Sequence, residues 1–281
     1  FRQKIFDEGI SKKPDIAIAI GDHVYWDLRG GDLPPFGRQQ SAFIKFLIGS
    51  LLKFLYGSFN RNEDGLSEHN EMVLKNIGND QIASLYGKRF KSIPIFFLPD
   101  DHDYFENDDA EENLVTFPAD EFSKSAFKGM ADLFYPPLLD CPNKAAERKI
   151  GRIRYGNLFE GLLADCAGDM SLGGKEAVLI DSKNEDWILS RFKNSSAKHL
   201  AFIPSHPLGY TAGKWREWYP DVVASEEEDG IIMNELLSGK KGKLTTKAEK
   251  YLWQKGWFLQ HQRFLKGLSD RKDSSFTFSG D

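Results

Sequence analysis

The sequence predicts an α/β protein in which helices pack against β-sheets. Short apolar runs typical of strands alternate along the chain with longer stretches typical of helices. Four of the apolar runs end in Asp or His, as strands do when their carboxyl ends form a site. The 281 residues are 41% hydrophobic, which is ample for a packed core.

The expected strands and helices follow from this alternation. Strands are expected over residues 15–20, 93–98, 152–159, 161–165, 200–204 and 276–279. Helices are expected over residues 1–10, 67–77, 80–90, 118–134, 185–192 and 247–268. Asp80 is an acceptable N-cap for its helix, and Pro118 stands where a first-turn proline belongs. Residues 225–250 are polar with segregated charges, so we expect an exposed excursion there.

The charge balance and the cysteines exclude some classes of function. Lys and Arg total 37 against 42 Asp and Glu, a net charge of −5, so no broad basic surface is expected and nucleic acid is not an expected partner. Cys141 and Cys166 form neither a disulfide framework nor a zinc-finger spacing. A single bridge and two reduced thiols both stay open, and the compartment is undetermined.

The most apolar stretch covers residues 42–59. A membrane span needs about 20 nearly uncharged residues, whereas Lys45, Lys53 and two glycines interrupt this stretch. We therefore expect a buried or lid-forming helix. A helix that contacts a membrane surface or a lipid substrate is the alternative.

The candidate chemistry lies where the strands end. Residues 21–25 (GDHVY), 100–103 (DDHD), 205–207 (SHP) and 280–281 (GD) each follow an expected strand. The carboxyl ends of strands in an open α/β sheet converge on one crevice, so these residues can meet in space. Carboxylates and imidazoles are ligands of first-row metals, and acids at this density repel one another without a cation among them. The sequence therefore predicts a metal site.

Taken in this order, the four motifs resemble those of the calcineurin-like metallophosphoesterases. The Asp-Asp-His-Asp run at 100–103 is similar in particular to the branch of PhoD-like alkaline phosphatases and phosphodiesterases. The resemblance spans residues 15–281. It implies a layered αββα sandwich, with mixed β-sheets flanked by helices, and hydrolysis of phosphate mono- or diesters at a dinuclear metal centre.

The resemblance also implies roles for single residues. Asp22 matches the aspartate that bridges two metal ions, and Tyr25 matches a tyrosine that binds a ferric ion. Asp101 stands at the position of a metal-binding asparagine and is also a catalytic candidate. His102 matches the histidine that stabilises phosphate charge or protonates the leaving group. His206 matches a metal-ligand histidine.

The last motif and the loop after His206 add four candidates. Asp281 matches the first residue of a Gly-Asp-x-His motif. Lys214 and Arg216 could bind a phosphate, and Trp215 could stack on a ring of the substrate. The alternative is that the aromatic residues of this loop only pack it onto the core.

The resemblance implies two metal ions, Fe³⁺ with Ca²⁺, Mn²⁺ or Zn²⁺, and a small-molecule, lipid or polymer phosphoester as substrate. We expect residues 1–281 to form a single metallophosphoesterase domain with insertions near 30–90 and 221–250. The first ligand motif of the superfamily and the histidine of the last motif are absent, so we expect the domain to be cut at both ends. A degenerate, non-catalytic binding module is the alternative, and Cys166 is expected to be a buried structural residue rather than a substitute ligand.

Overall fold

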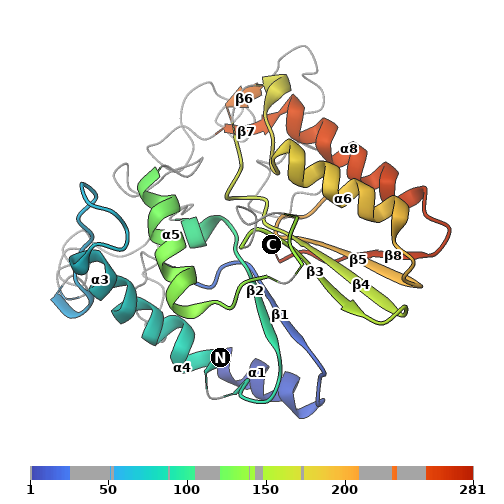
Figure 1. Cartoon of the computed structure of the whole chain (residues 1–281). Helices are drawn as coiled ribbons and strands as arrows, with labels where there is room; N and C mark the ends of the chain where they lie inside the picture. Colours follow the sequence, from blue (N-terminus) through green and yellow to red (C-terminus); the bar gives the residue numbers. More distant parts are fainter. Residues whose placement is uncertain are drawn as a thin grey trace, which may run out of the picture.

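The structure, a computed structural model, describes residues 2–25, 51, 54–87, 89–104, 121–138, 140–142, 148–171, 174–208, 230–232 and 251–280. It is a mixed α/β protein in which helices lie beside parallel and antiparallel strands (Figure 1). The predicted α/β class is therefore confirmed.

The described elements are as follows along the chain. The α-helices are α1 (Arg2–Ser11), α3 (Glu68–Gly78), α4 (Ser84–Tyr86), α5 (Glu121–Phe134), α6 (Ser182–Asn194) and α8 (Lys255–Ser269). The strands are β1 (Ala17–Ile20), β2 (Ile95–Leu98), β3 (Ile150–Tyr155), β4 (Phe159–Ala164), β5 (His199–Pro204), β6 (Gly230–Ile232), β7 (Tyr251–Gln254) and β8 (Ser274–Thr277). The short helical turns are the π-turn η1 (Asn79–Ala83) and the 3-10 turns η2 (Asp101–Tyr104) and η4 (Gly174–Glu176).

Two of the sheets position the candidate site. In the two-stranded sheet, β1 runs parallel to β2 with Ile20 opposite Leu98. The four-stranded sheet has the order β3-β4-β5-β8, in which β3 is antiparallel to β4 and the other pairs are parallel. A third pair, β6 and β7, is antiparallel.

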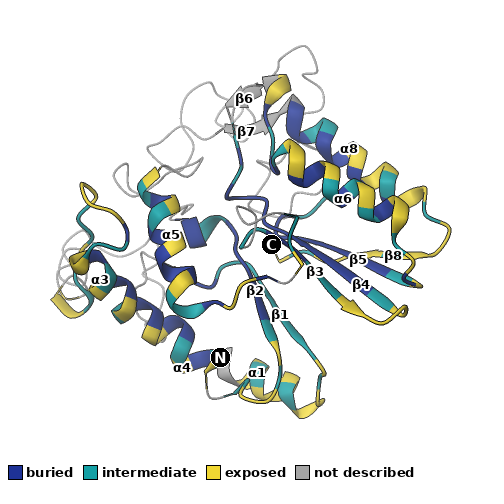
Figure 2. Cartoon of the chain, in the orientation of Figure 1, coloured by how far each residue is buried: buried dark blue, intermediate teal, exposed yellow. Residues whose placement is uncertain are grey.

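Successive strand residues face opposite sides of a sheet and so enter different apolar clusters. On β2, Phe96 and Leu98 join a cluster that also takes side chains from β4 and β5, whereas Ile95 and Phe97 face the cluster formed with α3 and α5. Strand β5 alternates in the same way between the shared cluster and a third cluster that includes residues of α6 and α8. Figure 2 shows the resulting buried inner faces of these helices and strands.

The strand predictions need one correction. The expected strand over 152–159 is two strands, because β3 ends at Tyr155 and β4 begins at Phe159. Gly156 between them has a φ of 53°, a conformation that suits glycine in a tight hairpin loop. The other expected strands are present with ends shifted by a few residues.

Two of the helix predictions need correction. Asp80 is not an N-cap, because Asn79 keeps right-handed helical angles and the chain runs on from α3 into η1. The helix expected over 247–268 begins only at Lys255, since the β-favouring residues 251–254 form β7 instead. Pro118 lies outside the described residues, and α5 is described from Glu121.

The apolar stretch over 42–59 is described only at residue 51 and from residue 54 onward. Leu51, Phe54 and Leu55 are exposed there, Phe54 by 86%, so these residues do not belong to a buried helix; the lid-forming alternative stays a prediction. Tyr56 and Phe59 do pack against the cluster under α3 and α5, so only one side of the segment reaches the core. Among the described helices, none has the length and apolar character that a membrane crossing requires.

Of residues 225–250 the structure describes only 230–232, so their expected exposure stays a prediction, whereas both cysteines are described. Strand β6, which lies in the 225–250 stretch, pairs with β7, so this part is not wholly irregular. Cys141 and Cys166 are not bonded to each other. Cys166 is buried, as expected, and burial raises the pKa of its thiol to about 12.

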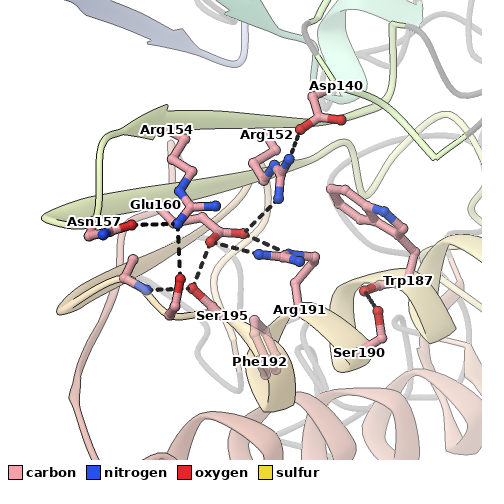
Figure 3. A network of polar contacts seen from close by, with 12 residues as sticks. Asp140, Arg152, Arg154, Asn157, Glu160, Trp187, Ser190, Arg191, Phe192 and Ser195 are labelled. Carbon is pink, nitrogen blue, oxygen red and sulfur yellow. Dashed lines mark hydrogen bonds and ion pairs between the residues drawn. The ribbon is translucent and has the colours of Figure 1, made fainter.

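An ion network surrounds the buried Glu160 at the start of β4, and Figure 3 shows it from close by. Glu160 is 0% exposed, and both of its oxygens accept hydrogen bonds from Arg191, at 2.7 and 2.9 Å. The hydroxyl of Ser195 donates to Oε2 over 2.6 Å, and Arg152 lies between Glu160 and Asp140 and pairs with both. We call these five residues the Glu160 network.

Candidate metal centre

The turn after β1 has an unusual backbone. Gly21 has a φ of 69° and Asp22 a φ of 52°. A Cβ on Gly21 would lie 2.8 Å from the Cβ of Asp100, so this position requires glycine for space as well as conformation. The left-handed Asp22 costs about 1 kcal/mol, a strain that is typical of functional sites. The turn brings Asp22 next to the residues that follow β2.

Asp103 holds the turns after β1 and β2 together. Its Oδ1 accepts the backbone N–H groups of His23 and Val24, at 3.2 and 3.1 Å. Its Oδ2 accepts the backbone N–H of Asp100 over 2.9 Å. Burial raises the pKa of Asp103 well above its usual value, although these N–H groups oppose the rise. Asp103 thus fixes the turn after β1 against the turn after β2.

Gln81 fixes the backbone of Tyr25. Tyr25 donates its N–H to Oε1 of Gln81 over 2.8 Å, and Nε2 of Gln81 donates to the carbonyl of Tyr25 over 2.9 Å. Gln81 is buried on η1, and π-turns of this kind are frequent at functional sites.

Asp22, Asp101 and His102 form a candidate ligand group. Each presents one ligand atom, and these atoms lie within 4.8 Å of one another. The hydroxyl of Tyr25 donates to Oδ2 of Asp22 over 2.8 Å, and its ring centroid lies 4.5 Å from that of His102. The backbone N–H of His102 donates to Oδ1 of Asp101 over 2.9 Å. The structure therefore brings four of the predicted site residues together.

Burial makes the environment of Asp22 unfavourable for a carboxylate. Burial raises its pKa and the charge of Asp100 raises it further, while the charge of His102 and hydrogen bonds with Tyr25 and Asp101 lower it; the net direction is upward. Its Oδ1 is buried and accepts no hydrogen bond within the described part of the chain. Buried carboxylate oxygens are normally paired, so a cation fits this oxygen and its neighbouring oxygen and nitrogen donors.

His206 lies beside this group, after β5. It is 2% exposed, and its Nδ1 lies 2.6 Å from Oδ1 of Asp100. That oxygen is buried and accepts no well-aligned hydrogen bond from any described residue. On α8, burial lowers the pKa of His261 to about 3, and the charge of His206 lowers it as well. A second imidazole therefore lies within electrostatic range of His206.

The strand end after β8 reaches the same place. The N–H of Gly280 donates to the carbonyl of Ser205 over 3.3 Å, and a Cβ on Gly280 would lie 2.6 Å from the carbonyl oxygen of Ile20. The four predicted strand ends thus converge. Asp281, Lys214, Trp215 and Arg216 lie outside the described residues.

Sequence reasoning missed Asp165 and assigned Asp100 no role of its own. Asp100 lies within the expected Asp-Asp-His-Asp ligand run, but the resemblance implies single roles only for Asp101 and His102; the contacts of Asp100 with Gly21 and His206 depend on the fold. Asp165 follows β4 and is buried against Tyr104. Asp165 directly follows an apolar strand, the same pattern that predicts candidate site residues at the other strand ends, so the sequence does contain a signal for it.

The described residues thus define a mixed α/β protein with a carboxylate-rich candidate metal centre at converging strand ends. No protein-family model and no curated protein matches the chain. Among solved structures, the fold is similar to that of PhoD, with a TM-score of 0.57 and 12% sequence identity over 98% of this chain. The chain spans about half the length of that PhoD chain, 47%. The chain therefore has a PhoD-like fold.

Proposed function

We propose that this chain is a metal-dependent hydrolase of phosphate mono- or diesters, a member of the PhoD-like branch of the calcineurin-like metallophosphoesterases. The proposal is carried by the grouping of Asp22, Asp101 and His102, together with a buried oxygen of Asp22 that accepts no hydrogen bond from the described residues. The PhoD-like fold supports it, because the motif order points to the same branch.

The proposal extends to the architecture, an αββα sandwich. The three apolar clusters support this order of layers. One joins α3 and α5 to the two-stranded sheet, one is shared by the two sheets, and one joins the four-stranded sheet to α6 and α8. Figure 1 shows the two helical groups on opposite sides of the molecule.

Two metal ions, Fe³⁺ with Ca²⁺, Mn²⁺ or Zn²⁺, would be held by the set Asp22, Tyr25, Asp101, His206 and Asp281. The oxygen donors of this set are hard ligands, which suit highly charged cations. When bound, such ions stabilise charge on the phosphoryl oxygens and lower the pKa of an attacking water. A phosphoester of a small molecule, a lipid or a polymer is the proposed substrate.

The side chains of this chain would do the rest of the chemistry. His102 is half-buried, its ring rests on that of Tyr25, and its backbone is tied to Asp101, so its imidazole is held at the site. We assign it proton transfer to the leaving oxygen, which contributes typically 10²–10⁴-fold to a rate. Lys214 and Arg216 would bind the phosphate, and Trp215 would stack on a substrate ring.

The test combines metal content with turnover. The purified protein is loaded with Fe³⁺ and Mn²⁺, dialysed, and its bound metal is measured by mass spectrometry. Hydrolysis of p-nitrophenyl phosphate and of bis(p-nitrophenyl) phosphate is followed in parallel. Asp22→Ala should lose both bound metal and turnover, because it removes the oxygen that accepts no hydrogen bond from the described residues.

Asp270→Ala is the matched control, since Asp270 is an exposed aspartate paired with Lys266 on α8. It should keep both metal and turnover. Unchanged metal content in Asp22→Ala would overturn the proposal. Metal binding without turnover of either ester would instead favour a degenerate binding module.

A further inference from the structure

Both carboxylate oxygens of Asp165 accept hydrogen bonds in the turn after β4, which contains none of the predicted metal ligands. Its Oδ2 accepts the hydroxyl of Tyr104 over 2.6 Å. Its Oδ1 accepts the backbone N–H groups of Ala167 and Gly168, at 2.8 and 3.0 Å. Asp165 and Tyr104 are 1% and 2% exposed. A buried pair with this many bonds has one defined geometry.

The turn over residues 165–168, here called the β4 turn, also contacts the strand end after β5. The backbone N–H of Cys166 donates to the hydroxyl of Ser205 over 3.0 Å. The N–H of Ser205 in turn donates to the carbonyl of Ala164 over 2.9 Å. The neighbour of Ser205 is His206. The β4 turn thus holds the segment that carries one candidate ligand.

Tyr104 joins the same turn to the other candidate ligands. It is the last residue of η2, which contains Asp101 and His102. Its ring packs on Phe127 with centroids 4.4 Å apart. A Cβ on Gly168 would collide with the Tyr104 hydroxyl and with Oδ2 of Asp165, so the turn fits closely around this hydrogen bond.

We infer that Asp165 is a positioning residue, which through Tyr104 and the β4 turn sets the place of His102 relative to His206. The two histidines belong to segments after β2 and β5, strands of different sheets. The Tyr104–Asp165 bond and the Cys166–Ser205 bond connect those segments through two consecutive residues of the β4 turn. The effect of Asp165 on catalysis rests on the proposed function, whereas its effect on the relative positions of His102 and His206 does not.

The primary test uses Tyr104→Phe, which keeps the ring and removes the hydroxyl. Its matched control is Ser195→Ala, which removes another 2.6 Å hydrogen bond from a hydroxyl to a carboxylate. Ser195 follows α6 and bonds Glu160 at the start of β4, at the opposite end of the strand from the β4 turn. Backbone amide resonances are compared by nitrogen-15 NMR in the metal-free protein. Tyr104→Phe should shift the signals of His102 and His206, and Ser195→Ala should leave them in place. Shifts confined to the β4 turn would overturn the inference.

Kinetics give the second readout. If the protein hydrolyses p-nitrophenyl esters, Tyr104→Phe should lower kcat by about tenfold with KM within about twofold, because small misplacements of catalytic groups mainly slow the chemical step. Asp165→Asn can still bond the turn and the Tyr104 oxygen, so it should retain more activity than Asp165→Ala. An unchanged kcat in both Tyr104→Phe and Asp165→Ala would count against the inference. If the wild type were inactive but Tyr104→Phe still shifted the signals of both His102 and His206, the proposed function would be overturned and the positioning role of Asp165 would stand.

Discussion

Two carboxylates, the buried Glu160 and the half-buried Asp22, meet different surroundings in this molecule. Glu160 accepts hydrogen bonds from Arg191 and Ser195 and also pairs with Arg152. Asp22 has both His102 and Asp100 as neighbouring charges, and its buried Oδ1 accepts no hydrogen bond within the described residues. Both oxygens of Glu160 are therefore paired with groups of the chain itself. The surroundings of Asp22 leave an acceptor that a cation would satisfy.

The pKa directions express the same difference. Burial raises the pKa of Glu160, but the hydrogen bonds from Arg191 and Ser195 and the arginine charges outweigh it, and the pKa falls below its usual value. Burial dominates at Asp22, whose pKa rises. A raised pKa indicates a functional site only together with geometry, because burial also raises the pKa of Asp103, which holds two turns together. At Asp22 the raised pKa accompanies a group of candidate ligands at converging strand ends.

The largest effect is expected for His102→Gln, which tests whether a residue of the candidate site affects turnover rather than stability. Removing a general acid lowers kcat by about 10²–10⁴-fold, while the half-buried side chain has little share in the core. Turnover of p-nitrophenyl phosphate and the thermal midpoint are measured together. His69→Gln, at an exposed histidine on α3, is the control and should change neither quantity much. A loss of stability equal to that of a core variant would place His102 with the structural residues.

The Glu160 network should show the reverse pattern. Glu160→Ala leaves Arg191 and Arg152 without their buried partner, and breaking such a pair costs about 3–5 kcal/mol. Urea unfolding in the presence of a chelator measures the loss. Glu160→Gln keeps an acceptor for Ser195 and Arg191 and should lose less. If the Glu160→Ala protein stayed folded but lost metal binding, Glu160 could not be assigned to structure alone and Asp22 to the metal site.

The pH dependence of stability separates Asp165 from Glu160. Burial raises the pKa of Asp165 from 3.8 to about 6, although Lys149 and the hydroxyl of Tyr104 lower it. Its protonated form favours the folded state, so this contribution is full below pH 3.8 and is lost as the pH rises to about 6, by about 3 kcal/mol. Glu160 contributes above pH 4.5, and its contribution is lost as the pH falls through its lowered pKa.

Urea midpoints of wild type, Asp165→Asn and Glu160→Gln across pH 3–7 test these signs. The difference between wild type and Asp165→Asn should fall as the pH rises from about 4 to 6. The difference between wild type and Glu160→Gln should rise with pH below about 4.5. A flat difference for Asp165→Asn would mean that its carboxyl titrates as in the unfolded chain.

The sequence predicted the class of fold and the strand ends, because apolar runs and the residues that follow them are local signals. It predicted the meeting of Asp22, Asp101 and His102 only through the rule that parallel strands end at one edge. It could not predict that Asp103 clamps two turns or that His206 contacts Asp100, since both depend on packing between distant segments. The expected last helix was placed too early because the β-favouring residues 251–254 find their strand partner only in β6, a pairing that local periodicity does not show.

The smallest effect is expected for Asp22→Asn in the metal-free protein, where it should raise stability. Asparagine tolerates the left-handed backbone at this position, so the substitution adds no strain. It removes a carboxylate whose pKa is raised mainly by burial, and we expect a gain of about 1 kcal/mol at neutral pH. The gain should shrink as the pH falls, because the wild-type carboxyl then becomes protonated. Urea unfolding with a chelator measures it, and a loss of stability in Asp22→Asn would show that Asp22 is satisfied by the chain, as Glu160 is.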